Sequence, residues 1–103
     1  MRFLLIIQLP GDSPADLDTL LALESQLEPV LGSGAEVDGH DIGACQGNIF
    51  VLTDSPADTF AHIQPLLRQN GLLGSARIAY RNLEDGEFTV LWPEGFSGQF
   101  TLA

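Results

Sequence analysis

The pentapeptide Asp-Ser-Pro-Ala-Asp occurs twice in the chain, at residues 12–16 and again at residues 54–58. Each copy follows a short apolar run, residues 3–7 in the first case and residues 49–52 in the second. Serine is a favoured helix N-cap, proline suits the first helical position, and an aspartate three residues after the cap can accept a hydrogen bond from the backbone N–H of the cap. The repeat therefore predicts two strand-to-helix turns.

Apolar residues with helical spacing follow both copies of the repeat. We expect Ser13 to cap the first helix, which Gly32 ends, and Ser55 to cap the second, which ends near Asn70. The predicted apolar stripes are Leu17, Leu20, Leu21, Leu27, Val30 and Leu31 in the first helix, and Phe60, Ile63, Leu66 and Leu67 in the second.

Three further strands are predicted. Residues 35–42 form a weak one, broken by Asp38-Gly39, a pair that favours turns and bulges. Residues 76–83 form a stronger strand, and a hairpin turn leads from it into residues 88–92. The resulting order is β-α-β-β-α-β with one extra strand. Right-handed crossovers then place the first and third strands in the centre of the sheet and both helices on one face.

Over residues 2–83 this pattern resembles the ferredoxin-like (split βαβ) superfamily of α+β sandwiches, which includes ACT-type regulatory domains and small dimeric monooxygenases. The resemblance implies a scaffold and not an activity. The expected fold is therefore a ferredoxin-like βαββαβ sandwich with an additional C-terminal hairpin strand. Residues 1–95 form its single domain, and residues 96–103 form a tail that packs on it. A lone cysteine, Cys45, cannot hold an iron–sulfur cluster, and no cofactor is expected.

The net charge of the chain limits the classes of molecule that it is expected to bind. Fourteen Asp and Glu face four Arg and no Lys, which gives a formal net charge of −10. Such a surface repels nucleic acid and anionic membranes, and it suits a basic protein partner; an acidic surface that serves solubility alone is the alternative. No apolar stretch is long enough to span a bilayer, and the single cysteine suits a reducing compartment, so a cytoplasmic protein is expected.

Residues 36–47 collect the side chains that a catalytic or metal site would use. Asp38, His40, Asp41 and Cys45 lie there, but His40 and Asp41 point to opposite faces of an extended strand. Asp38 and His40 share a face only if no bulge intervenes. Cys45 could act as a nucleophile with His40 as its base, although the surrounding carboxylates disfavour a thiolate. This segment is therefore a weak alternative site.

Two clusters of charge lie further along the chain. Arg77 and Arg81 share one strand face and could hold an anion such as a carboxylate, but in so acidic a chain we expect them to pair with its own carboxylates. The predicted hairpin tip carries Glu84, Asp85 and Glu87. This acidic tip is the best local candidate for contact with a basic partner.

The two central strands are apolar on both faces. Leu4 and Ile6 lie opposite Phe3, Leu5 and Ile7, so the face away from the helices would expose a large apolar patch. Its cover is the tail, a different protein or a second copy of the chain, and we expect the second copy.

These features favour a small acidic non-enzymatic protein-binding or regulatory module, of which an inhibitor or an immunity-type protein is one form. One alternative is a dimeric ACT-like small-molecule-binding regulatory domain. The other is a small enzyme that uses the region from His40 to Cys45.

Overall fold

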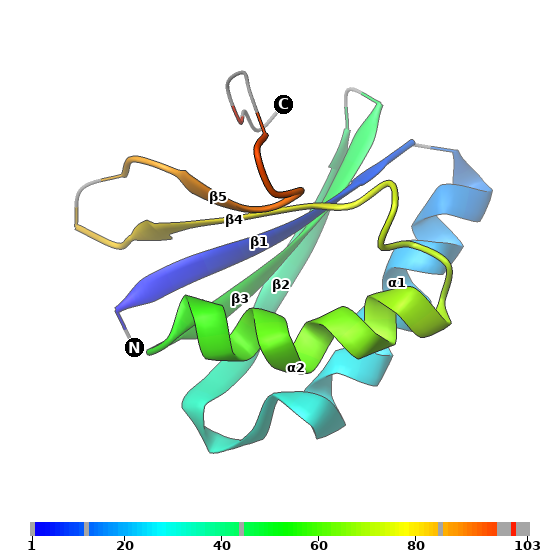
Figure 1. Cartoon of the computed structure of the whole chain (residues 1–103). Helices are drawn as coiled ribbons and strands as arrows, with labels where there is room; N and C mark the ends of the chain where they lie inside the picture. The colour runs from blue at the N-terminus through cyan, green and yellow to red at the C-terminus, as the bar shows by residue number, and fades with distance from the viewer. Residues whose placement is uncertain (1, 12, 44, 85, 97–99, 101–103) are drawn as a thin grey trace.

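The computed structural model describes residues 2–11, 13–43, 45–84, 86–96 and 100 (Figure 1). Its elements are β1 (Phe3–Pro10), α1 (Pro14–Leu31), the short 3-10 helix η1 (Gly32–Gly34), β2 (Ala35–Gly43), β3 (Gln46–Thr53), α2 (Pro56–Gln69), β4 (Arg77–Asn82) and β5 (Thr89–Trp92). All five strands join one antiparallel sheet in the order β2-β3-β1-β4-β5. The predicted α+β class is therefore confirmed.

The strand order places β1 and β3, the two most apolar strands, inside the sheet. Both helices lie against one face, and residues 93–96, which follow β5, rise on the opposite side (Figure 1). This arrangement of four strands and two helices is compatible with a ferredoxin-like fold, and β5 is added beyond β4. As expected from the Asp85-Gly86 pair, β4 and β5 are antiparallel neighbours, although Asp85 itself lies outside the described residues.

The main core fills the space between the helices and the sheet. Leu5, Ile7 and Leu9 of β1 face it, because alternate residues of a strand point to the same side. The stripe of α1 differs from the prediction: Leu20, Leu23, Leu27 and Leu31 are its buried residues. Residues three and four positions apart share one face of a helix, and the buried face is the one that carries Leu20, Leu23, Leu27 and Leu31. Leu21 and Val30 lie off this face and are exposed.

The two Asp-Ser-Pro-Ala-Asp segments both start helices, but only the first forms a capping box. The Ser13 hydroxyl accepts a hydrogen bond from Asp16 N (3.2 Å), and the Asp16 carboxylate accepts one from Ser13 N (3.1 Å). Ser55 occupies the N-cap of α2, as predicted, but its side chain makes no cap hydrogen bond, so the second capping box is absent. Thr53 organises this turn instead, because its Oγ1 accepts from Ser55 N (3.0 Å).

We predict unequal effects of removing the two serine hydroxyls. Ser13→Ala should lower the free energy of unfolding by about 1 kcal/mol, because the Asp16 N–H loses its acceptor at the start of a helix. Ser55→Ala should stay within about 0.5 kcal/mol of the parent, because no cap bond is lost. Urea denaturation of both variants measures this difference, and equal losses would contradict it.

Candidate functional site

The face of the sheet away from the helices, here called the open face, is covered in part by the chain itself. Ile6 and Ala79 are fully buried there, packed against the buried ring of Phe100. The Phe88 ring contacts Phe100 as well, with their centroids 5.1 Å apart. Ile6 therefore offers no surface to a second copy of the chain.

Partly buried apolar residues remain around this covered centre: Leu4, Phe50, Phe88 and Val90. Of the two residues on which a dimer was expected to depend, Leu4 alone retains some exposure. The dimer stays a prediction, and the apolar area still open to it is smaller than the sequence indicates.

A row of polar side chains crosses the open face beyond the apolar centre. The strand register sets Arg77 of β4 opposite Gln8 of β1, Gln8 opposite Asn48 of β3, and Asn48 opposite Asp41 of β2. Gln8 Nε2 donates to Asn48 Oδ1 (3.2 Å), and Asn48 Nδ2 donates to Asp41 Oδ1 (3.0 Å). Both amides are buried, with Gln8 5% and Asn48 1% exposed, so these bonds replace lost contact with water.

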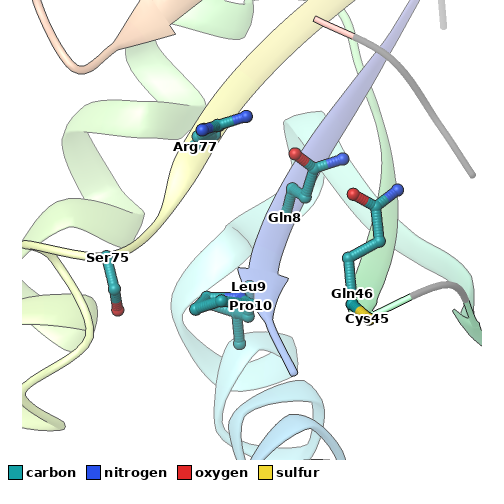
Figure 2. A pocket seen from close by; sticks show the side chains of 7 residues that line it. All are labelled: Gln8, Leu9, Pro10, Cys45, Gln46, Ser75 and Arg77. Carbon is teal, nitrogen blue, oxygen red and sulfur yellow. The ribbon is translucent and has the colours of Figure 1, made fainter. Parts of the chain in front are cut away.

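A cleft of about 210 Å³ opens beside this row, at the end of the sheet where β1 stops. It is lined by Gln8, Leu9, Pro10, Cys45, Gln46, Ser75 and Arg77. Figure 2 shows these residues arriving from three neighbouring strands and their turns. The Nε2 atom of Gln46 is buried, and within the described part of the chain it has no hydrogen-bond partner.

Arg77 differs from the sequence expectation. Among the described residues an ion pair joins His40 to Glu24, but no carboxylate lies within ion-pair distance of Arg77 or Arg81. The guanidinium of Arg77 instead lies over the ring of Phe96, with Cζ 5.2 Å from the ring centroid. The predicted pairing of these arginines with the chain's own carboxylates is therefore wrong for the described residues.

The proposed catalytic segment is divided between two faces of the sheet. His40 faces the helices, where its Nδ1 lies 3.0 Å from Glu24 Oε2. Asp41 faces the opposite side in the polar row, and Cys45 lines the cleft. His40 therefore lies on the helix side of the sheet and Cys45 lies at the cleft, so the fold does not bring the two groups together.

Asp38 lies at an irregularity in β2, because the register with β3 shifts between Val37 and Gly39. The Asp38-Gly39 pair therefore forms the bulge for which its composition is suited. A bulge changes the direction in which Asp38 points relative to His40. The described residues contain no group of three potential metal ligands.

Five carboxylates lie on the edge strand β2 and on the second half of α1. Glu24 reaches His40 from α1, and Glu28 follows it one helical turn later on the same helix face. We define the acidic edge as Glu24, Glu28, Glu36, Asp38 and Asp41. The four arginines lie elsewhere, on β4, before β1 and at the end of α2.

The predicted acidic tip is described only in part. Glu84 and Glu87 are exposed on either side of the β4–β5 turn, and Asp85 lies outside the described residues. Glu84 also borders a second cleft with Arg2, Asn82 and Leu83. The tip therefore has a cation near it, whereas the acidic edge has only His40.

Searches of family models, curated proteins and solved structures found no match to this chain. In the described part of the chain, no helix combines the length and the apolar character needed to cross a membrane. The function is therefore inferred from the chain's own geometry.

Sequence reasoning missed Gln8, Asn48 and Gln46. The sequence does contain a signal for Gln8 and Asn48. Gln8 immediately follows the apolar run of β1, and Asn48 immediately precedes the apolar run of β3. Antiparallel pairing of these two runs brings their polar neighbours opposite each other.

We predict that the polar row contributes to stability mainly through Asn48. Asn48→Ala should lower the free energy of unfolding by about 1–3 kcal/mol, because the buried amide of Gln8 loses its acceptor. Asp41→Asn, at the exposed end of the row, should cost less. Urea denaturation of both variants is the measurement, and an Asn48→Ala loss no larger than that of Asp41→Asn would contradict the prediction.

Proposed function

We propose that this chain is a non-enzymatic binding module of ferredoxin-like fold that docks an extended basic segment of another protein on its acidic edge. The strand order β2-β3-β1-β4 and the placement of both helices on one face support the ferredoxin-like assignment. The cytoplasm, as a reducing compartment, suits the exposed thiol of Cys45.

The local excess of negative charge on and beside the edge strand β2 carries this proposal. The acidic edge holds five carboxylates and no arginine, whereas the arginines lie on other parts of the described chain. Three of these carboxylates, Glu36, Asp38 and Asp41, stand exposed on β2 itself. A lysine- or arginine-rich partner would therefore be steered to this side of the molecule.

The position of β2 favours an extended partner. It is nine residues long and lies at one edge of the sheet, so within the described part of the chain the backbone groups on its outer side have no neighbouring strand. An added strand can use those groups, while its alternate side chains meet the carboxylates. Two β2 strands from two copies would repel each other, because each brings its own acids. The edge thus discriminates between a basic segment and a second copy of itself.

The alternatives have less support. An enzyme that pairs Cys45 with His40 would need both groups at one place, but His40 contacts Glu24 on the helix side and Cys45 lines the cleft. A dimer formed by the open face has lost its central residue, Ile6, to contact with Phe100.

The proposal predicts site-specific loss of binding to a basic peptide. The probe is an extended peptide of alternating Lys and Val, titrated while backbone amide resonances are followed by NMR. The combined change Glu28→Gln, Glu36→Gln and Asp38→Asn should weaken binding about tenfold, and the resonances of β2 should move most in the parent. Added salt should weaken parent binding steeply.

The control removes the same number of charges elsewhere, by Asp18→Asn, Glu84→Gln and Glu94→Gln, all exposed outside the acidic edge. This variant should bind nearly as the parent does. Equal loss of peptide affinity in both variants, or resonance shifts spread evenly over the surface, would overturn the proposal. Either result would show that the peptide responds only to the net charge of the protein. If light scattering shows a dimer, and Leu4→Asp converts that dimer to a monomer, then the open face binds a second copy of the chain instead.

A further inference from the structure

We infer that the cleft beside the polar row is a binding site for a small organic monocarboxylate. The inference is independent of the proposed basic partner, because the cleft is formed at the ends of β1, β3 and β4 and the acidic edge by β2 and α1. It rests on the cavity and on two groups that lack a partner among the described residues: an arginine without a carboxylate and a buried amide nitrogen without an acceptor.

Arg77 is the first observation. In a chain of formal charge −10, it has no carboxylate within ion-pair distance among the described residues. Its guanidinium is oriented by the Phe96 ring, and it lies opposite Gln8 on the same face of the sheet. A planar guanidinium with several N–H donors matches the two oxygens of a carboxylate.

Gln46 is the second observation. Its Nε2 is buried without an acceptor within the described chain, and a buried donor left unpaired is costly. Figure 2 shows its amide oxygen on the side nearer Gln8. A half-turn about the last side-chain bond exchanges the two ends of the amide. The NH₂ group then faces the cleft, where a ligand oxygen would satisfy it.

The other cleft residues restrict the ligand. Pro10 is exposed and supplies apolar surface at the cleft, so an organic group is accommodated beside the charged one. Arg77 is the single cation among the described residues that line the cleft, and the field of an acidic protein opposes further negative charge. These conditions favour one carboxylate attached to a small apolar group over phosphate, which carries more charge.

Cys45 provides a direct readout of occupancy. It is the only cysteine in the chain, it is exposed, and it lines the cleft. A bound ligand should therefore slow alkylation of Cys45 by iodoacetamide. NMR of the side-chain NH₂ groups of Gln8 and Gln46 gives a second readout that does not depend on the thiol.

The test titrates the full chain with benzoate, and with benzamide and inorganic phosphate as matched probes. Benzoate should protect Cys45 and shift the Gln46 NH₂ resonances, while benzamide, which has the same ring without the charge, should do neither. Arg77→Gln should weaken benzoate binding about tenfold or more. Arg81→Gln is the control, because it removes the same charge from the same strand face but outside the cleft.

Three outcomes would overturn the inference. The first is equal protection by benzamide, which would show that the apolar ring alone binds. The second is equal weakening by Arg81→Gln and Arg77→Gln, which would show a general effect of charge. The third is the absence of both protection and resonance shifts at millimolar benzoate, or tighter binding of phosphate than of benzoate.

Discussion

The central strand β1 must be covered on both faces, and much of the structure follows from that constraint. Leu5, Ile6 and Ile7 are consecutive residues without exposed surface, yet their side chains alternate between the two sides of the sheet. The helices bury Leu5 and Ile7, whereas Phe100 packs on Ile6 from the other side. A sheet with helices on one face usually leaves its second face to water, so this chain needs an additional cover.

On the open face, β1 changes from apolar to polar at Gln8, and that change creates the polar half of this face. Once Gln8 is buried, its amide needs a partner, and the register supplies Asn48. Asn48 in turn needs an acceptor, which Asp41 provides from the edge strand. The row therefore joins the interior of the sheet to its acidic side. Its other end is Arg77, for which the described chain offers an aromatic ring and no carboxylate.

The two proposed interactions use opposite charges in separate places. The carboxylates of the acidic edge would repel a second β2 strand, which carries the same charges, and would attract a basic strand. In the cleft, hydrogen-bond donors would help one arginine of a strongly acidic protein to hold an anion, and the NH₂ group of Gln46 would supply one after a half-turn of its amide.

The sequence by itself determined the elements of this protein and their order. Strands, helix starts and the bulge at Asp38-Gly39 depend on residues within a few positions of one another, so local patterns predicted them. Local patterns predicted some details wrongly, because these details depend on residues that are distant in the sequence. Ser55 stands at the N-cap of α2 without a side-chain cap bond, and Leu23 rather than Leu21 lies on the buried face of α1.

Only the tertiary structure decided the candidate site. Gln8, Asn48 and Arg77 lie far apart in the chain, and they meet because three strands pair in one particular register. The same register separates His40 from Cys45, although only a few residues lie between them. Side-chain alternation makes this dependence sharp, because a shift of one residue in pairing would move each of these groups to the other face of the sheet.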